Sequence, residues 1–286
     1  MLCKIAIRSF CNWYPIILPE IQRLMYICPE YRKMIYHYKD APIFYQITGE
    51  GPVVVLLHGF LESSSMWQGL IPTLETSKKV ILIDLPGHGQ SGNFSEVHAM
   101  ELMASVVFSL LKHLKIDRIE LIGHSMGGYV GLAFLEAYGG MVDKFTLLNS
   151  TTLPDSEVQK QNRDRAARLI SENKKSFINN IMNVLFIPTA QQSYRNEIAK
   201  LKDEAQSFSE KGIIAATLGM KQRPDRTAVL KQFNNEKVII CGDVDPVVPL
   251  TSSKAIAAAT QARLEVLKGG HMSWVENLEE LVNLCT

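Results

Sequence analysis

The 286 residues carry a formal net charge of +1, from 30 basic and 29 acidic side chains, and 47% of them are hydrophobic. This balance argues against a nucleic-acid partner, which requires a basic surplus to neutralise phosphates, while the length suits one large α/β domain or a core with an insertion. No apolar run approaches the ~20 residues that span a bilayer, so we expect no stable membrane insertion.

Residues 1–34 do not fit the pattern of the rest of the chain. Lys4 and Arg8 precede an apolar patch, in the order of a signal peptide, but Pro15 and Pro19 interrupt the patch and no small-residue cleavage site follows. The same prolines argue against a helix on a membrane surface. We expect an N-terminal extension outside the fold, or a translation start that has been placed too early.

From residue 35 the sequence shows the short apolar runs of a sheet. Ile35–Tyr38 and Pro42–Ile47 flank a short turn and predict a hairpin. Five continuous apolar runs predict strands that are buried on both faces: Val53–Leu57, Val80–Ile83, Ile119–Ile122, Phe145–Leu148 and Val238–Cys241. A last strand is expected over Arg263–Leu267.

Helical patterns separate these strands. They cover Val97–Leu114, Met126–Tyr138, Ser252–Thr260 and Val275–Cys285. Because strands and helices alternate, we predict an α/β fold with a mostly parallel sheet and helices on both of its faces. The core of this fold is expected over residues 35–150 and 235–286.

Residues 151–234 break the alternation, since they contain no convincing strand. An unstructured loop of this length would be implausible inside a compact domain, so we predict an inserted helical subdomain. Its apolar residues around Met182 and Leu185 recur at helical spacing, and we expect them to face both the core and a ligand. Its basic run, Lys160 to Lys175, is expected to be a solvated helix face.

The pentapeptide Gly123-His124-Ser125-Met126-Gly127 lies between a predicted strand and a predicted helix. A nucleophile elbow needs this sharp strand-to-helix turn, with glycine two residues before and two residues after the serine to avoid clashes. The Gly-x-Ser-x-Gly pattern alone is weak evidence for a nucleophile, so the interpretation depends on the motifs that follow the other predicted strands. The start of the helix would also offer backbone N–H groups to a developing oxyanion.

Three further segments follow predicted strands and agree with this interpretation. His58-Gly59-Phe60 follows the first buried strand, Gly242 to Pro249 follows the fifth, and Gly269-Gly270-His271 follows the last. Each segment also has a structural alternative. The first would be an ordinary turn after a strand, the second an Asx-type turn at Asp245-Pro246, and the third a loop with a packed histidine. The chain order of Ser125, Asp245 and His271 favours a catalytic set, because folds with a nucleophile elbow carry the serine, the carboxylate and the histidine in this order.

These segments, together with Asp84-Leu85-Pro86-Gly87-His88-Gly89, resemble the motifs of the α/β-hydrolase superfamily over roughly residues 35–286. The resemblance implies that Ser125 is the nucleophile, that His271 is the base and that Asp245 orients the base. It implies an oxyanion hole formed by the backbone N–H groups of Phe60 and Met126. The insertion at 151–234 falls where family members carry a helical cap, which we expect to set substrate choice.

The residues around the nucleophile narrow the expected activity. A serine at position 125 argues against haloalkane dehalogenases and epoxide hydrolases of this fold, and His124 before it is found in many esterases, lipases and haloperoxidase-like members. Members of this fold that make a menaquinone precursor usually carry Arg where this chain has Tyr129, and the difference argues against that activity. We predict hydrolysis of a carboxylic ester with a small or medium apolar substrate. A C–C bond hydrolase, an acyltransferase and a non-catalytic ligand-binding member stay open as alternatives, as does a homo-oligomer.

No cofactor or metal is expected. Gly87-His88-Gly89-Gln90-Ser91-Gly92 has the spacing of a dinucleotide-binding turn, but such a turn opens a helix directly, whereas Asn93-Phe94-Ser95 intervene here. The histidines show no metal-ligand spacing. The five cysteines are odd in number and form no C-x-x-C pair, which favours a reducing, cytoplasmic compartment: Cys3, Cys11, Cys28, Cys241 and Cys285.

Asp245 rather than Asp243 is expected to be the carboxylate of the catalytic set. It stands at the last position of a Gly-x-x-Asp pattern and precedes Pro246, which restricts its backbone. Asp245→Asn should leave the fold intact but lower kcat by orders of magnitude, ~10⁴ in the reference serine protease, because the imidazole takes the wrong tautomer. Asp243→Asn should have a much smaller effect. Measuring kcat and Tm for both variants tests the assignment, and the reverse result would refute it.

Overall fold

The computed structural model describes residues 32–285 of the chain. The predictions made for residues 1–31 lie outside the described residues. Within the described residues the first strand begins at Arg32, three residues before the predicted start of the fold. Strand β1 (Arg32–Tyr38) and strand β2 (Ala41–Thr48) form the expected hairpin across Lys39 and Asp40, which both have positive φ, as a two-residue hairpin turn requires.

The described residues contain an eight-stranded sheet. Its remaining strands are β3 (Val53–Leu57), β4 (Lys79–Ile83), β5 (Ile119–His124), β6 (Val142–Leu148), β7 (Glu236–Gly242) and β8 (Arg263–Leu267). The strand order is β1-β2-β4-β3-β5-β6-β7-β8; β2 and β4 are antiparallel, and every pair from β4 to β8 is parallel. The predicted α/β fold with a mostly parallel sheet is confirmed.

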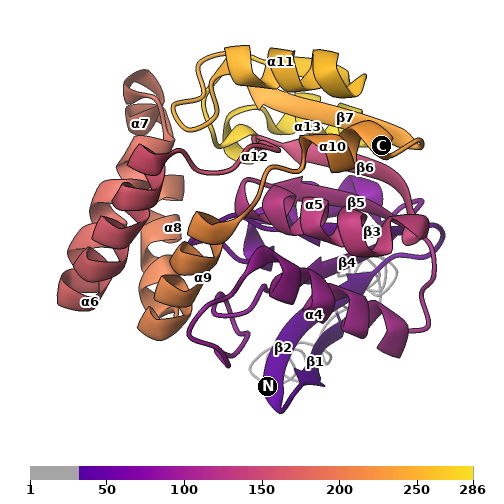
Figure 1. Ribbon diagram of the computed structural model, residues 1–286, viewed down its shortest axis with the longest axis horizontal. Helices are drawn as coiled ribbons and strands as arrows, with labels where there is room; N and C mark the ends of the chain where they lie inside the picture. The colour runs from indigo at the N-terminus through magenta and orange to yellow at the C-terminus, as the bar shows by residue number, and fades with distance from the viewer. Residues whose placement is uncertain (1–31, 286) are drawn as a thin grey trace, which may run out of the picture. The chain divides into compact units, whose positions relative to one another are not determined.

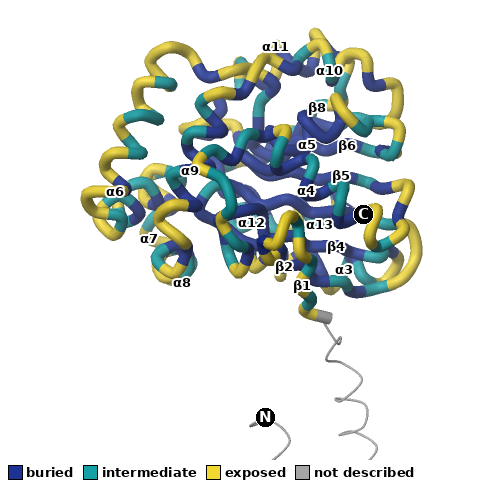
Figure 2. Tube along the Cα trace, turned by 60° about the horizontal axis from the view of Figure 1, so that its bottom comes forward, coloured by how far each residue is buried: buried dark blue, intermediate teal, exposed yellow. Residues whose placement is uncertain are grey.

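Two sets of helices cover the sheet. The first set consists of α4 (Met100–His113), α5 (Met126–Tyr138), α10 (Thr227–Gln232) and α11 (Leu250–Thr260). In this set, α4 packs on α5, and α10 packs on both α5 and α11. The second set consists of the 3₁₀-helix η1 (Ser64–Gly69), α3 (Ile71–Leu74), α12 (Ser273–Glu276) and α13 (Leu278–Cys285). Figure 1 shows α4 and α5 over one face, and Figure 2 shows buried strands between the helices. Side chains of both layers therefore fill the core.

Some short elements were not predicted from the sequence. The single helix expected over Val275–Cys285 is wrong, because the chain leaves helical geometry at Asn277 (φ −138°, ψ 41°), between α12 and α13. Helices η1, α3 and the 3₁₀-helix η2 (Gly139–Met141) are too short to produce a periodic apolar pattern. Long helices and strands therefore leave a periodic apolar pattern in the sequence, whereas single helical turns do not.

Residues 151–234 contain helices, as expected for the insertion. They are α6 (Glu157–Leu185), α7 (Pro188–Ser193), α8 (Arg195–Ser207), α9 (Glu210–Gln222) and the already described α10. Helix α6 packs on α8 and α9, whereas α10 packs on α5 and α11 of the core. Figure 1 shows α6 to α9 grouped at one end of the sheet. The division of the chain into a core and a cap stays a prediction.

Helix α6 consists of two straight parts. It kinks at Asn173, whose backbone is not helical (φ −157°, ψ 79°), and Asn173 Oδ1 accepts a hydrogen bond from the backbone N–H of Ser176. Asn173 thus caps the second part of the helix, because its side chain satisfies an N–H that the kink leaves without a helical partner. Among residues 32–285, no helix combines the length and the hydropathy that crossing a bilayer requires.

A chain that starts at Met34 should fold and retain its activity. It keeps the hydrogen bond of 2.6 Å between the Tyr36 hydroxyl and Ser109 Oγ, and it loses only the first two residues of edge strand β1. We expect its Tm to lie within about 3 °C of the full chain, since a small change in stability moves Tm by a few degrees in a protein of this size.

The matched control starts at Lys39 and lacks β1 altogether. It should melt well below both other chains, because the edge of β2 loses its hydrogen-bonding partner. An insoluble or inactive Met34 chain would mean that residues 1–33 belong to the folded core.

Candidate active site

The chain turns sharply from β5 into α5 at Ser125. The backbone of Ser125 has φ 49° and ψ −113°, a conformation that is strained for a residue with a Cβ. A Cβ on Gly123 would lie 2.4 Å from the carbonyl oxygen of Gly127, and a Cβ on Gly127 would lie 2.3 Å from the carbonyl oxygen of Leu57. Glycine is therefore required at both flanking positions, as the motif predicted.

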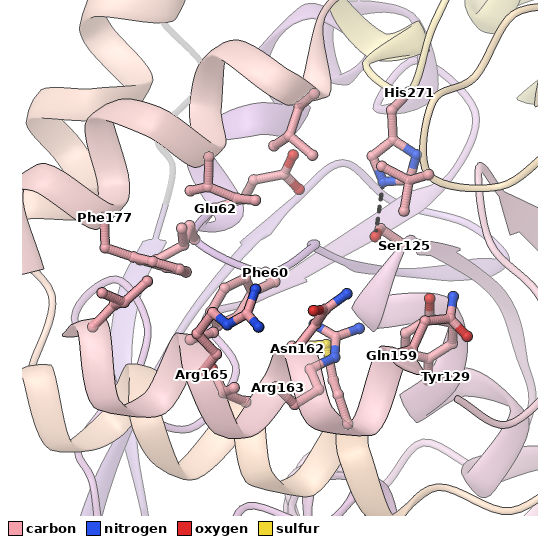
Figure 3. A pocket seen from close by; sticks show the side chains of 18 of the residues that line it. Phe60, Glu62, Ser125, Tyr129, Gln159, Asn162, Arg163, Arg165, Phe177 and His271 are labelled. Carbon is pink, nitrogen blue, oxygen red and sulfur yellow. Dashed lines mark hydrogen bonds between the residues drawn. The ribbon is translucent and has the colours of Figure 1, made fainter. Parts of the chain in front are cut away.

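The three residues of the predicted catalytic set lie in contact. His271 Nε2 is 2.9 Å from Ser125 Oγ (Figure 3). His271 Nδ1 is 3.0 and 2.9 Å from the two carboxylate oxygens of Asp245. A carboxylate accepts hydrogen bonds, so Nδ1 carries the proton and Nε2 is free to accept the serine proton. The arrangement can generate a nucleophilic serine oxygen.

The electrostatics of Asp245 suit this contact. Burial raises the pKa of Asp245, but His271 and the hydrogen bonds from the backbone N–H groups of Val248 and Val247 outweigh burial, so the net pKa shift is downward. Asp245 therefore remains a carboxylate at neutral pH. Asp243 is exposed, and its Oδ1 accepts a hydrogen bond of 2.9 Å from the N–H of Gly269. Of the two candidate aspartates, only Asp245 contacts His271.

The loop after β3 brings Phe60 to the same place. His58 Nδ1 donates to the carbonyl oxygen of Gly59 at 2.7 Å, and His58 Nε2 accepts from the N–H of Leu85 at 2.8 Å. Burial lowers the pKa of His58, which agrees with this neutral tautomer. Within the described part of the chain, the N–H groups of Phe60 and Met126 donate no hydrogen bond. Both donors are thus available to a substrate oxygen.

Two side chains that sequence reasoning missed hold the loop of His271. Asn149 Nδ2 donates to Asp245 Oδ2 at 3.1 Å and to the carbonyl oxygen of Gly270 at 3.2 Å. Glu276 Oε2 accepts from the N–H of Gly270 at 2.6 Å. Asn149 comes directly after β6, next to β7 in the sheet, so the rule that strand ends carry functional residues would have found it. Glu276 carries no such signal.

A buried pair, Glu62 and His124, joins the loop after β3 to the loop after β8. Glu62 Oε2 lies 2.9 Å from His124 Nδ1 and accepts a hydrogen bond of 2.7 Å from the N–H of Gly59. His124 Nε2 donates to the carbonyl oxygen of His271 at 3.0 Å. Both side chains are 1% exposed. The pair therefore links the backbone before Phe60 to the backbone of the candidate base.

Glu62 and His124 each stabilise the charged form of the other side chain. Burial lowers the pKa of His124, but the Glu62 carboxylate, its hydrogen bond and the bond to His271 together outweigh burial and raise the pKa. Burial likewise raises the pKa of Glu62, but the charge of His124 and the hydrogen bonds from His124 and Gly59 produce a net lowering. We conclude that the pair is a carboxylate and an imidazolium.

A cavity of about 320 Å³ opens beside Ser125 and His271. Phe60, Glu62 and Tyr129 line it from the core, while α6 supplies one long wall. The first part of α6 contributes mainly polar residues and the second part contributes apolar ones: Gln159, Asn162, Arg163, Arg165, Ala166 and Leu169, then Phe177, Ile181 and Leu185. The cavity thus has a polar and an apolar part.

Two expectations about α6 are corrected here. Met182 is fully buried among apolar side chains of α6, α8 and α9 and does not line the cavity, whereas Leu185 does. The basic run is not only a solvated face, because Arg163 and Arg165 line the cavity. A difference of one or two positions on a helix decides which side chain faces the cavity, and sequence spacing cannot resolve that without the partner elements.

The turn at Gly87–Gly92 does not open a helix. Asp84 holds it, with Oδ2 accepting from the N–H of Gln90 at 2.8 Å, and α4 begins only at Met100. The turn therefore lacks the helix N-terminus on which a dinucleotide pyrophosphate would sit. Its hydrogen bonds to Asp84 fix the turn at the end of β4.

Comparisons with known proteins agree with the fold. A family model described as alpha/beta hydrolase fold matches residues 52–278. A 2-hydroxy-6-oxononadienedioate/2-hydroxy-6-oxononatrienedioate hydrolase of Pseudomonas putida is 29% identical over 262 residues, covering 84% of this chain and 89% of that protein.

Solved structures share the fold. A thermophilic esterase from Thermogutta terrifontis, with malate bound, superposes with a TM-score of 0.83 and 29% identity, covering 89% of this chain and 96% of that one. An enol-lactonase from Burkholderia xenovorans superposes with a TM-score of 0.82 and 21% identity, covering 88% and 98% of the two chains. At that identity the second likeness shows the fold alone.

Removing the Glu62 carboxylate should destabilise the protein. Glu62→Ala leaves His124 and the N–H of Gly59 without a partner, and we expect a loss of about 3 kcal/mol, as for other broken buried pairs. Glu62→Gln keeps an acceptor for Gly59 and should lose less. Thermal unfolding of the wild type and both variants measures the difference.

The difference between wild type and Glu62→Gln should depend on pH. The raised pKa of His124 makes its contribution complete below the ordinary value of 6.5 and lost as pH rises through the raised pKa. The lowered pKa of Glu62 makes its contribution complete above 4.5 and lost as pH falls through the lowered pKa. The Tm difference should therefore be largest between these two values, and a constant difference across pH would contradict the ion pair.

Proposed function

The chain is a hydrolase that belongs to the alpha/beta hydrolase fold family, and on this premise we propose that it cleaves carboxylic esters of small or medium, mainly apolar substrates through an acyl-enzyme. The observation that carries the proposal is the contact of 2.9 Å between Ser125 Oγ and His271 Nε2, with Asp245 on the opposite nitrogen of the ring. Such an arrangement has the geometry of an activated nucleophile.

In the proposed reaction Ser125 Oγ attacks the ester carbonyl carbon while its proton moves to His271 Nε2. The tetrahedral intermediate then collapses, and the imidazolium returns that proton to the alcohol that leaves. A water molecule repeats the sequence on the acyl-enzyme, with His271 again as base, and releases the acid and the free serine. Asp245 keeps Nδ1 protonated throughout and stabilises the imidazolium that forms in each half.

The N–H groups of Phe60 and Met126 are proposed to hold the oxygen that becomes negative. Each such donor typically contributes ~3 kcal/mol to the transition state. The pair Glu62 and His124 supports this role, because Glu62 binds the N–H next to Phe60 while His124 binds the carbonyl of His271. Donor and base are thereby held by one buried unit.

The size and lining of the cavity support the proposed substrate. A volume of about 320 Å³ accommodates a small or medium ligand, at the lower end of common ligand sites. Phe177, Ile181 and Leu185 offer an apolar surface for an acyl chain. We propose that the segment 151–234 acts as a cap, which excludes water and sets substrate choice. Its lining residues come from α6 and α9, which supply no member of the proposed catalytic set.

Hydrolysis of a carbon–carbon bond next to a carbonyl group is the second candidate. It is favoured by the similarity to a hydrolase of 2-hydroxy-6-oxononadienedioate over 84% of the chain. The same serine, histidine and oxyanion donors would then act on a ketone carbonyl, with a carbon leaving group in place of an alcohol. The two candidates differ in the bond that breaks, which a substrate panel can separate.

The predicted compartment stays part of this proposal. Cys241 and Cys285 are free thiols and both are buried in the described part of the chain. Free thiols are usual in reducing surroundings, which supports a cytoplasmic location.

A panel of p-nitrophenyl esters of increasing acyl length tests the proposed activity. The wild type should hydrolyse short and medium esters and react with a fluorophosphonate probe. Ser125→Ala should fold, fail to label and lose at least ~10⁴-fold in kcat, since the nucleophile is gone. Ser105→Ala on α4 is the matched control, because Ser105 lies outside the site, and it should behave as wild type.

A 2-hydroxy-6-oxo-dienoate completes the panel. Its disappearance can be followed by absorbance. If its kcat/KM exceeds that of every ester, the second candidate replaces the first. A folded protein that neither labels nor turns over any member of the panel would refute both and favour a non-catalytic ligand-binding role.

A further inference from the structure

The charged groups around the cavity are unevenly distributed. Glu62 is an acidic residue of the lining, and its charge is compensated by His124 at 2.9 Å. Asp245 lies behind His271 and is already satisfied by hydrogen bonds from His271, Asn149 and two backbone N–H groups. Neither carboxylate is available to pair with a basic group at the α6 wall.

The α6 wall carries an excess of positive charge. Asp155 is 1% exposed and pairs with Arg163 at 3.0 Å and with Arg223 at 2.7 Å. Two guanidinium groups therefore depend on one carboxylate. Arg223 also lies over the ring of Tyr129, 4.1 Å from its centroid, and Tyr129 lines the cavity. The group of three is left with one uncompensated positive charge next to the cavity.

Arg165 adds a second positive charge. It lines the cavity, and within residues 32–285 its side chain makes no hydrogen bond or ion pair. Figure 3 shows the side chains of Arg163 and Arg165 extending from α6 into the space between this helix and Ser125. The nearby Asp164 does not compensate them, because it pairs with Lys221 at 2.6 Å.

We propose that Arg165, assisted by the excess charge of the group Arg163–Asp155–Arg223, forms an anion subsite, and that the substrate carries a carboxylate in addition to the ester. This inference rests on the proposed function and specifies the substrate class of the same site. Arg165 presents a planar fork of donors, which matches a carboxylate in two parallel hydrogen bonds. The apolar part of the cavity then holds the carbon chain that carries the ester.

The charges also determine where the acid lies. Asp245 is beside His271, so a substrate carboxylate at that end would face another negative charge. The guanidinium groups of Arg163 and Arg165 are on the α6 wall (Figure 3). The acid therefore points toward α6 while the ester carbonyl points toward Ser125, which fixes the orientation of the bound substrate.

Binding to the Ser125→Ala variant tests the subsite without chemistry. The probes are monomethyl esters of straight-chain dicarboxylic acids from succinate to suberate, each compared by isothermal titration with the neutral ester in which an amide replaces the free acid. The amide has nearly the same size and shape, so the comparison isolates the charge. The acid of best length should bind at least tenfold more tightly than its amide.

A second change on the same helix isolates Arg165. Arg165→Gln, made in the Ser125→Ala background, should reduce the preference to threefold or less, because the binding of the acid weakens much more than that of the amide. Arg168→Gln is the matched control, because Arg168 is an exposed arginine of α6 that does not line the cavity, and it should retain the full preference. Higher salt should weaken the preference, since the charges are partly exposed.

Several results would overturn the subsite. They are equal binding of acid and amide at every length, equal effects of the two arginine changes, and no measurable binding of any acid at about 10 mM. Failure of the proposed function looks different, because the wild type would then hydrolyse no ester while the Ser125→Ala variant still preferred acids. Conversely, rapid hydrolysis of neutral esters without a preference for acids would refute the subsite and leave the ester hydrolase standing.

Discussion

The site depends on one sharp turn, in which the chain passes from β5 to α5 through Ser125 alone. The positive φ of Ser125 costs on the order of 1–3 kcal/mol, so the surroundings must compensate. The N–H of Ser125 donates to the carbonyl of Leu148, and Ser150 Oγ donates to the carbonyl of Ser125. These bonds hold the strained residue at the carboxyl edge of the sheet, where the loops after β3, β7 and β8 also end. The other contacts of the site can form only when Ser125 lies at that position.

Buried charge is used in this protein to join backbone segments. Glu62 and His124 each bind a backbone group on a different loop, so the pair connects the segment after β3 with the segment after β8. A buried ion pair adds little net stability, because desolvation offsets the attraction, but it fixes geometry. The ion pair of Glu62 and His124 thus holds the two loops in position. The strained turn fixes the position of Ser125, and this pair holds the backbone before Phe60 at a fixed distance from the backbone of His271.

Sequence patterns predicted the parts of the fold that follow from local periodicity or from fixed spacing. The bounds of β3, β8 and α5 matched, because each is a strong periodic or motif-bounded segment. Proline after Asp245 separated it from Asp243, and the geometry agrees with that choice. Glu62 was missed because its partner, His124, lies 62 positions away, and a single glutamate in a loop carries no pattern. Contacts between elements distant in sequence need the packed structure.

The kink at Asn173 shows how one helix can supply two kinds of surface. Before the kink α6 presents Arg163 and Arg165 to the cavity, and after it α6 presents Ile181 and Leu185. A straight helix of this length would carry its second part away from a small cavity, since each residue adds 1.5 Å along the axis. The groups that contact Ser125 come from the ends of core strands, whereas α6 supplies side chains of the cavity wall. The candidate catalytic residues and the α6 residues of the cavity wall therefore belong to separate segments, so the wall can change in sequence while the strained turn and its supports stay the same.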